Sequence, residues 1–151
     1  MYVQSILDTK GSEVVTTRPE ETIAATARLL AKHRIGAVLV LSGDAGDGDD
    51  GRRVIGVISE RDIVAGMAAH GPGVADMKVS DLMTRDVVLC RPTDTIEDIM
   101  TVMTGRRIRH LPVVEEDRLV GIVSIGDVVK QRLDETAMEM DSLRQYVLAG
   151  R

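Results

Sequence analysis

The sequence contains two imperfect copies of one unit, and each copy ends on a similar stretch. The first ends with Gly-Val-Ile-Ser-Glu-Arg-Asp at 56–62 and the second with Gly-Ile-Val-Ser-Ile-Gly-Asp at 121–127. A duplicated unit must bury its apolar face against its sibling, so the repeat predicts two similar folding units with a cleft at their seam. The Ser-x-x-Asp that closes each copy is therefore the first candidate for a binding site.

The copies differ in length at one place. Pro19 aligns with Pro92 at an offset of 73 residues, whereas Asp62 aligns with Asp127 at an offset of 65, so the first copy carries eight extra residues. These fall in the acidic, glycine-rich stretch 42–51, which we expect to be a solvated hairpin loop. The loop spells Gly-x-Gly-x-x-Gly, but a strand follows it and its aspartates would repel a pyrophosphate, so we reject a dinucleotide fingerprint. The spacing of an EF-hand calcium loop is also absent.

Each copy has the predicted element order β-α-β-β-α, which belongs to the α/β (α+β) class. In the second copy, Thr95 begins a helix whose apolar residues recur at i, i+3, i+4 and i+7, and Ser124 begins another helix. Short apolar runs in this copy predict strands at 87–90, 111–114 and 119–123. The matching elements of the first copy are strands near 14–16, 37–41 and 54–58 and helices near 22–33 and 59–70.

The repeats divide the chain into three predicted parts. The first repeat with its lead-in segment takes 1–73, the second repeat takes 74–133, and the remainder is 134–151. The lead-in is duplicated too, because its residues 3–7 resemble 79–83. In the third part, apolar residues keep a near-heptad spacing that predicts one more amphipathic helix. This helix packs on its own domain or on a second copy of the chain, or it recognises a partner.

Composition argues against several functions. The formal net charge is −5 and the chain has no Phe or Trp, so it lacks the basic surplus and the stacking platforms of nucleic-acid-binding proteins. The lone Cys90 excludes an internal disulfide, and nothing predicts a signal peptide or a membrane span, so we expect a cytoplasmic protein with no membrane partner. His33, His70 and His110 lack further ligands at metal-binding spacing, so no metal is predicted. We find no nucleophile–base pair, and we predict that the chain is not an enzyme.

The chain resembles a tandem pair of cystathionine-β-synthase (CBS) domains, also called a Bateman module. In the second copy the resemblance rests on Arg-Ile-Arg-His-Leu-Pro-Val-Val at 107–114 and Leu-Val-Gly-Ile-Val-Ser at 119–124. In the first copy it rests on Arg-Ile-Gly-Ala-Val-Leu-Val at 34–40 and on 56–64. It covers the chain from about residue 3 to residue 133. Each motif alone is weak evidence, but the ordered set occurs twice.

The resemblance implies two CBS units that pack about a pseudo-twofold axis and bind adenosine-containing ligands in the clefts between them. It implies a regulatory nucleotide sensor rather than a catalyst, with AMP, ADP, ATP, NAD(H) or S-adenosylmethionine as the ligand. Such pairs commonly form homodimers. Nucleotide occupancy would then bias the packing of the units and signal to a separate effector protein.

The resemblance also assigns roles to individual residues. Asp62 and Asp127 would accept the ribose hydroxyls, and Ser59 and Ser124 would lie near the phosphate or the ribose. Basic residues before the Pro-Val-Val strand would hold the phosphate, namely Arg107, Arg109 and His110. The base would lie against the first strand of each unit, at Thr17 and Cys90. The chemistry agrees, because a carboxylate can accept from both hydroxyls of a diol and a helix start offers free N–H groups to phosphate.

The two sites are expected to differ. Opposite Arg109 and His110 the first copy has Gly36 and Ala37, so the phosphate-binding pair is missing from the first copy. We therefore expect the site of the second copy to prefer the more anionic ligand. The site of the first copy would be weaker, differently selective or dependent on Arg61.

Three alternatives remain beside this interpretation. Ser-x-x-Asp before an apolar run is also a helix cap, and a cap and a ribose site can coexist at the same residues. A structural dimerisation or interaction module with no nucleotide ligand is the second alternative. An enzyme is the third, but the repeats already account for most of the 151 residues and leave no room for a catalytic domain.

Overall fold

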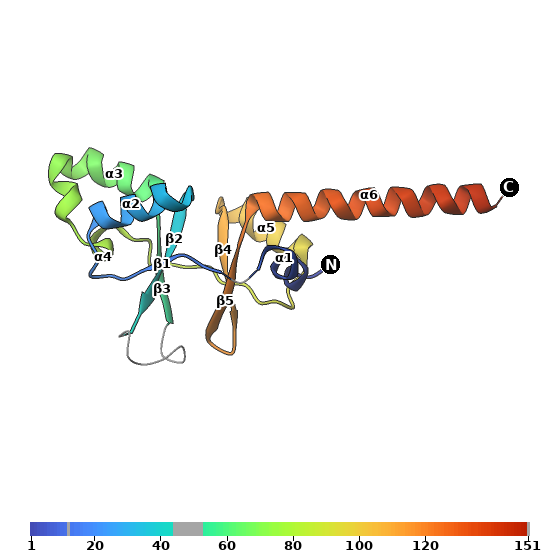
Figure 1. Cartoon of the computed structure of the whole chain (residues 1–151), viewed down its shortest axis with the longest axis horizontal. Coiled ribbons are helices and arrows are strands. Elements are labelled where there is room, and N and C mark those ends of the chain that lie inside the picture. The colour runs from blue at the N-terminus through green and yellow to red at the C-terminus, as the bar shows by residue number, and fades with distance from the viewer. Residues whose placement is uncertain (12, 44–52, 151) are drawn as a thin grey trace.

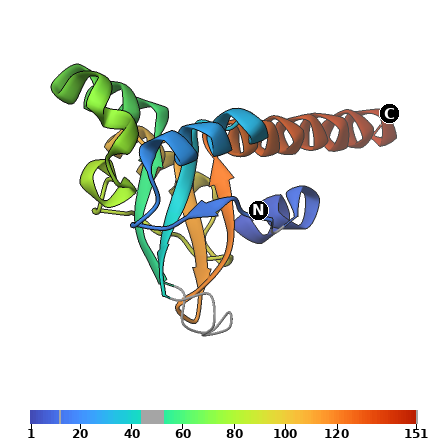
Figure 2. The same ribbon diagram turned by 60° about the vertical axis from the view of Figure 1, so that its left-hand side comes forward.

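The computed structural model describes residues 1–11, 13–43 and 53–150, which form two α+β halves (Figures 1 and 2). The elements of the first copy are α1 Val3–Lys10, β1 Thr16–Thr17, α2 Ile23–His33, β2 Ala37–Ser42, β3 Arg53–Ser59, α3 Glu60–His70 and the 3-10 helix Gly71–Asp76. Those of the second copy are α4 Val79–Leu82, α5 Ile96–Arg106, β4 His110–Glu115, β5 Arg118–Ser124 and α6 Ile125–Ala149. The strands of the two halves lie side by side at the centre, where β3 contacts β5. The mixed content of helix and strand confirms the predicted α+β class.

Strand pairing is similar in the two halves. β1 runs parallel to β2, β2 runs antiparallel to β3, and β4 runs antiparallel to β5. The hairpin between β4 and β5 closes through Glu116 and Asp117, whose φ angles of 51° and 62° are typical of a two-residue type I′ turn. The hairpin loop expected at 42–51 in the first copy lies outside the described residues from position 44 onward.

The strand predicted at 87–90 is wrong. This segment makes a single parallel bridge, between Cys90 and Val113, whereas β1 of the first copy pairs with β2 at two positions. Pro112 occupies the place that Leu39 takes in the first copy. Because proline has no N–H to donate, the next pairing along the ladder cannot form.

Threonine and serine side chains begin the four main helices as the sequence predicts. The Thr22 hydroxyl accepts from the Ala25 N–H at 3.1 Å, and the Thr95 hydroxyl accepts from the Asp98 N–H at 3.1 Å. Ser59 and Ser124 cap α3 and α6 in complete capping boxes. These bonds satisfy donors that a helix start would otherwise leave free.

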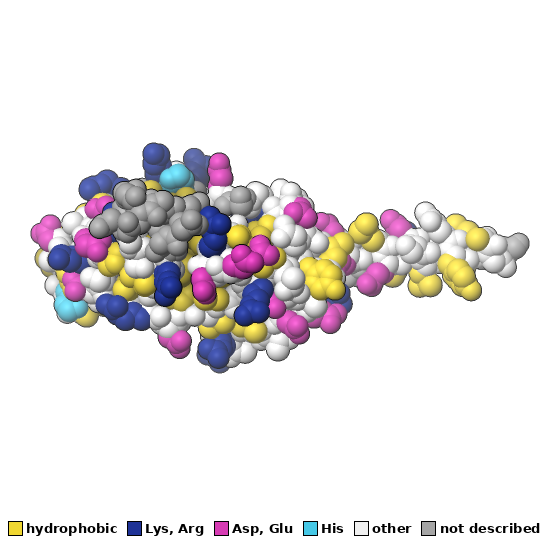
Figure 3. Space-filling view, turned by 90° about the horizontal axis from the view of Figure 1, so that it is seen from below, with side chains coloured by type: hydrophobic (Ala, Val, Ile, Leu, Met, Phe, Trp, Pro, Cys, Tyr) yellow, Lys and Arg dark blue, Asp and Glu magenta, His cyan; other side chains and the backbone are white. Residues whose placement is uncertain are grey.

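α6 is one continuous helix, so the prediction of a separate helix after Leu133 is wrong. Neither proline nor glycine occurs between positions 127 and 149, so the backbone has no reason to break at the repeat boundary. The C-terminal part of α6 extends away from the body as a rod, with apolar side chains along it (Figures 1 and 3). The large exposed apolar residues of α6 are Val129, Leu133, Met138, Met140, Leu143, Tyr146, Val147 and Leu148.

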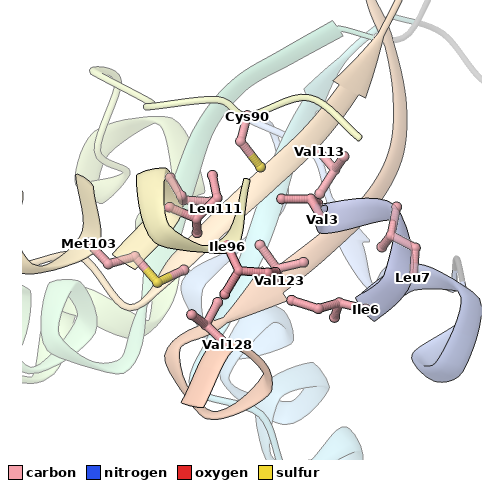
Figure 4. Packing of buried hydrophobic residues seen from close by; sticks show 11 residues of the cluster. Val3, Ile6, Leu7, Cys90, Ile96, Met103, Leu111, Val113, Val123 and Val128 are labelled. Atoms are coloured by element: carbon pink, nitrogen blue, oxygen red, sulfur yellow. The ribbon is translucent and has the colours of Figure 1, made fainter. Parts of the chain in front are cut away.

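The lead-in helices exchange partners between the halves. α1 precedes the first copy in the chain, but its buried residues join the core of the second copy, beside Leu111 and Val123 (Figure 4). These α1 residues are Val3, Ile6 and Leu7. In the same way, Val79 and Met83 at α4 join the core of the first copy. Each half therefore contains the lead-in of the other copy, while the predicted boundaries at 73/74 and 133/134 stay predictions.

Backbone hydrogen bonds fix the exchanged helices in equivalent places. The Val3 N–H donates to the Asp94 carbonyl at 2.9 Å, and the Val79 N–H donates to the Glu21 carbonyl at 2.8 Å. Both acceptors lie just before a helix cap, at Thr95 and at Thr22 respectively. The exchange is thus part of the duplicated fold and not a feature of one terminus.

The exchange of the lead-in helices explains why the stretches 56–62 and 121–127 both begin with a glycine. A Cβ atom at Gly121 would lie 2.6 Å from Leu7 Cδ2, and one at Gly56 would lie 2.8 Å from Met83 Sδ and 3.0 Å from the Thr84 carbonyl oxygen. Non-bonded carbon atoms normally stay about 3.5 Å apart or more. A hydrogen is therefore the only side chain that lets the lead-in residues lie against β3 and β5 without displacement.

Among the described helices, none combines the length and the apolarity that a bilayer crossing requires. Cys90 is buried in the core of the second half, where burial and then Asp94 raise the pKa of its thiol to about 12. The thiol is therefore protonated at neutral pH, and it packs as a small apolar side chain.

Candidate functional site

A pocket of about 460 Å³ lies at the seam and takes residues from both copies. Its polar lining from the first copy comes from the N-cap and the first turn of α3: Ser59, Glu60, Arg61 and Asp62. Its basic lining from the second copy is the turn between α5 and β4: Arg107, Arg109 and His110. The segment that leads into the second copy adds Thr84, Asp86, Val87 and Val88. The volume is within the usual range for small-molecule sites, about 300–1,000 Å³.

Ser59 and Asp62 are hydrogen-bonded to each other at the start of α3. Asp62 Oδ2 accepts from the Ser59 N–H at 2.9 Å and from the Ser59 hydroxyl at 3.1 Å, while Ser59 Oγ accepts from the Asp62 N–H at 3.3 Å. The other carboxylate oxygen, Oδ1, accepts from the Thr84 hydroxyl at 3.3 Å. The helix-cap interpretation is therefore confirmed. Because this long bond comes from a rotatable hydroxyl, Oδ1 can exchange it for another donor in the pocket.

A left-handed turn at Arg107 begins the basic segment that lines the pocket. Arg107 follows the last turn of α5 with φ 54°, a left-handed conformation that turns the chain from the helix toward β4. Arg34 has the same conformation after α2, with φ 53°, so the turn is duplicated. Beyond the turn, the Arg109 carbonyl accepts from the Ile125 N–H at 2.8 Å, which ties this corner to the start of α6.

The structure corrects how the site residues are grouped. Arg109 and His110 were expected to serve the site of their own copy, and the first-copy site was expected to lack this pair of residues. They line the pocket that contains Ser59 and Asp62 instead, so that second expectation is wrong. Residues close in sequence were assumed to share a site, but the halves meet so that the start of α3 faces the turn before β4. Gly36 and Ala37 also line this pocket.

The second Ser-x-x-Asp has a different surrounding. Ser124 and Asp127 form the same capping box, with 2.9 Å from the Ser124 N–H to Asp127 Oδ2 and 3.1 Å from the Asp127 N–H to Ser124 Oγ. The ammonium of Lys10, from the end of α1, donates to the same Oδ2 at 2.7 Å and to the Ile122 carbonyl at 3.1 Å. Burial raises the pKa of Asp127, but the hydrogen bonds from Lys10 and Ser124 outweigh it and hold the pKa below the usual 3.8.

His110 lies between the two Ser-x-x-Asp motifs. It lines the seam pocket, and its partner across the β4–β5 ladder is Ser124. Burial lowers the pKa of His110 below the usual 6.5; Lys10 and Arg109 lower it further, and Asp127 opposes them. The imidazole is therefore neutral at pH 7, and gains a proton only in more acidic solution.

We expect an NMR titration to place the pKa of His110 below 6.5, and Lys10→Met to raise it, because one nearby positive charge is removed. Since the folded state holds the depressed pKa, protonation favours unfolding. The contribution of His110 to stability is therefore present above 6.5 and is lost as the pH falls toward the folded-state pKa. Lys32→Met, which removes a lysine from the last turn of α2, is the control. A pKa of 6.5 or higher in the wild type would contradict this assignment.

Other nominated residues do not line this pocket. Thr17 is buried in β1 and pairs with Val40, and Cys90 is buried against Val113. Arg61, whose role was left open, does line it. Sequence reasoning missed Thr84, which belongs to the lead-in of the other copy, and Lys10, which lies 117 residues from Asp127. No local pattern could have revealed either contact.

No cluster of three or more His, Cys, Asp or Glu suited to a metal ion occurs among residues 1–11, 13–43 and 53–150. The Asp62 and Asp127 carboxylates instead face hydroxyl, N–H and ammonium groups. What the seam pocket can hold chemically is a ligand with hydroxyl donors at one end and an anion at the other.

Comparison with known proteins identifies relatives of the whole arrangement. A family model for the CBS domain matches residues 4–69 and 79–134. Over 133 residues the chain is 30% identical to the mitochondrial CBS domain-containing protein CBSX3 of Arabidopsis thaliana, an alignment that covers 87% of this chain and 62% of the length of that protein.

Solved structures share the fold. The CBS-domain containing protein ATU1752 from Agrobacterium tumefaciens has a TM-score of 0.78 and 46% sequence identity, with 87% of this chain and 92% of that chain covered. The CBS domain pair of protein MJ0100, in complex with 5′-methylthioadenosine and S-adenosyl-L-methionine, has a TM-score of 0.74 over 89% of this chain and 98% of that chain. At 22% identity the latter shows the likeness of the fold alone.

Proposed function

We propose that this chain, which belongs to the CBS-domain family and contains a pair of CBS domains, binds an adenosine-containing ligand in the seam pocket and signals its occupancy to a partner protein. The pair is a regulatory module. The observation that carries the proposal is the pocket itself, which places Asp62 from one copy and the basic turn 107–110 from the other around one volume of about 460 Å³.

The Asp62 side of the pocket suits a ribose. Its Oδ1 atom has one long bond, from the Thr84 hydroxyl at 3.3 Å, while Oδ2 is held by Ser59. The capping box fixes the carboxylate in place before a ligand arrives, which reduces the ordering cost of binding. A vicinal diol that donates to this carboxylate forms charge-assisted hydrogen bonds, the stronger class.

The basic side suits a phosphate, and the apolar lining suits a base. Arg107 and Arg109 offer planar guanidinium donors that match phosphate oxygens. Apolar lining comes from both copies and from the segment between them: Val57, Val87, Val88 and Ile108. The adenine is therefore proposed to lie against these residues, and not against the buried Thr17 and Cys90. Support for the ligand class comes from MJ0100, whose CBS pair is solved with two adenosine derivatives.

Charge balance in the pocket favours a ligand with few negative charges. Three arginines line it, Arg61, Arg107 and Arg109, and three carboxylates line it, Glu60, Asp62 and Asp86. Each further phosphate would meet these carboxylates without a matching cation, and like charges repel strongly where water is partly excluded. We therefore expect AMP to bind more tightly than ATP.

Differential scanning fluorimetry with an extrinsic dye tests this function on adenosine, AMP, ADP, ATP, NADH and S-adenosylmethionine. AMP is expected to raise the melting temperature by several degrees at saturation, because it binds only the folded state. Arg109→Ala should reduce the preference for AMP over adenosine about tenfold or more, since a charge-assisted bond to phosphate is lost. Arg106→Ala, at the last residue of α5 and outside the pocket lining, is the matched control. If none of the six compounds shifts the transition, the proposal is wrong.

A second candidate is an interaction module without a nucleotide. The exposed apolar residues along the rod of α6 favour it, because large exposed apolar patches mark contact surfaces. Under this candidate the homodimer is the functional unit, and Leu143→Glu would shift it toward monomer in light scattering while no ligand in the panel alters the melting curve. A ligand response that disappears in Asp62→Asn would exclude this candidate.

A further inference from the structure

We propose that Thr84 is a specificity-determining residue of the seam pocket: its hydroxyl oxygen accepts a hydrogen bond from one ribose hydroxyl while Asp62 accepts from the other. The pocket therefore selects ribonucleotides over nucleotides that lack one of the two hydroxyls. This inference rests on the proposed function, because it concerns the ligand of the same pocket. It adds a residue that precedes the second copy and lies outside both Ser-x-x-Asp motifs.

The Asp62 carboxylate has fewer open acceptor positions than a vicinal diol requires. Each carboxylate oxygen can accept about two hydrogen bonds. Oδ2 already accepts two, from the Ser59 N–H at 2.9 Å and from the Ser59 hydroxyl at 3.1 Å. Oδ1 accepts one, from the Thr84 hydroxyl at 3.3 Å, so one position on Oδ1 stays open. A diol brings two O–H donors, and the second donor needs another acceptor nearby.

The Thr84 hydroxyl oxygen meets this need. A hydroxyl donates one hydrogen and also has two lone pairs that can accept. Among the described residues, the hydrogen bond to Asp62 is the one bond of this hydroxyl. Thr84 Oγ1 and Asp62 Oδ1 lie 3.3 Å apart, a spacing comparable to that of hydroxyl oxygens on adjacent ring carbons. Because both residues line the pocket, two adjacent hydroxyls can donate to these two oxygens together.

The backbone fixes Thr84 in place before a ligand arrives. Its N–H donates to the Val57 carbonyl at 2.8 Å, and its carbonyl accepts from the Val57 N–H at 3.0 Å. The preceding side chain, Met83, is buried in the core of the first half. An acceptor that is fixed in advance reduces the ordering cost of binding. Since Thr84 itself is exposed, a substitution of its side chain leaves the core unchanged.

The short length of α4 explains why a hydroxyl lies beside Asp62. α4 ends at Leu82 and the next residue is extended, so the chain runs beside β3 at Thr84. In the other lead-in the equivalent residue is Asp8, because 79–83 resemble 3–7. Asp8 still lies within α1, which is eight residues long. The threonine beside the carboxylate therefore belongs to the seam pocket and is not part of the duplicated pattern.

Calorimetric titration of AMP, 2′-deoxy-AMP and 3′-deoxy-AMP tests the proposal on the wild type and on Thr84→Val. The wild type should bind both deoxy compounds more weakly than AMP, by about threefold or more for the hydroxyl at Thr84 and about tenfold or more for the hydroxyl at Asp62. Valine keeps the shape of threonine but has no acceptor. Thr84→Val should weaken AMP binding about threefold to tenfold, and one deoxy compound should then bind it as tightly as AMP does.

Two further variants control for effects of the substitution itself. Thr84→Ser keeps the hydroxyl and should retain the wild-type order of affinities. Thr101→Val is the matched control, because Thr101 is also exposed and its hydroxyl donates to the Glu97 carbonyl, but it does not line the pocket. Without ligand, the melting temperature of Thr84→Val should stay close to that of the wild type, since exposed side chains contribute little to stability.

The outcomes separate this inference from the proposed function. If Asp62 alone accepts from both hydroxyls, Thr84→Val will bind AMP at least as tightly as the wild type does, and both deoxy compounds will stay weak. That result refutes the role of Thr84 and leaves the seam pocket standing, as does a loss of AMP binding in Thr84→Ser. Equal binding of all three compounds by the wild type refutes recognition of the ribose by both residues. Absence of binding of all three refutes the proposed function and this inference with it.

Discussion

Replacing Leu7 by alanine is expected to lower the free energy of unfolding by about 2–4 kcal/mol, the usual cost of truncating a core leucine. Leu7 lies in the lead-in of the first copy, but it is 7% exposed and packs in the core of the second copy. The change should therefore weaken the half to which Leu7 does not belong in sequence. Urea unfolding gives the free energy, and hydrogen exchange should show faster exchange in β5 than in β3.

Leu143→Ala is the matched control, because it removes the same atoms from a side chain that is 58% exposed on α6. It should change the free energy of unfolding by about 0.5 kcal/mol or less. A second test uses Gly121→Ala, whose Cβ would lie 2.6 Å from Leu7 Cδ2. Gly121→Ala should destabilise the wild type more than it destabilises Leu7→Ala, because the shortened side chain makes room for the methyl group. Equal effects of Leu7→Ala and Leu143→Ala would contradict the exchange of lead-in helices.

The second large effect is expected from Asp62→Asn, which should weaken binding of AMP about 30-fold to 100-fold, or about 2–2.7 kcal/mol. Asparagine keeps the shape of the side chain and one acceptor oxygen for the cap, but it has no charge and presents an amide donor to the diol. The free energy of unfolding should fall by only about 1 kcal/mol, the cost of a weakened cap. Calorimetric titration measures the first quantity and urea unfolding the second.

Asp81→Asn is the matched control for this effect. Asp81 Oδ2 also accepts a backbone N–H three residues earlier, from Lys78 at 3.0 Å, but Asp81 does not line the seam pocket. The control should lose a similar small amount of stability and keep the affinity for AMP. Equal affinities of the wild type and Asp62→Asn would show that Ser-x-x-Asp is a helix cap and nothing more.

Local features were predicted well because they depend on neighbours in the chain. The starts of α2, α3 and α5 follow from the hydroxyl of Thr22, Ser59 and Thr95, each of which reaches an N–H within the next turn. The failures depend on distant partners. The apolar run 87–90 has the composition of a strand, but Pro112 in the neighbouring strand removes the donor it needs.

The residues named from the sequence include part of the lining of the seam pocket, but Thr17, Cys90, Ser124 and Asp127 do not line it. Ser59, Asp62, Arg61, Arg107 and Arg109 were all nominated, and all line one pocket. Which aspartate the arginines accompany depends on how the halves meet across the seam. A periodic pattern within one copy contains no information on the angle at which two copies pack.

By itself the sequence determined that the chain is a duplicated α+β unit of the CBS type, because repetition, apolar periodicity and capping residues act over a few positions of chain. The tertiary structure alone decided that the lead-in helices exchange halves, that the basic turn of the second copy faces Asp62, and that Lys10 neutralises Asp127. These contacts join residues far apart in the chain, and they exist only once burial of two apolar faces has fixed the halves against each other. The duplicated Ser-x-x-Asp is thus one motif in two electrostatic environments, with the Thr84 hydroxyl at the Asp62 carboxylate and the Lys10 ammonium at the Asp127 carboxylate.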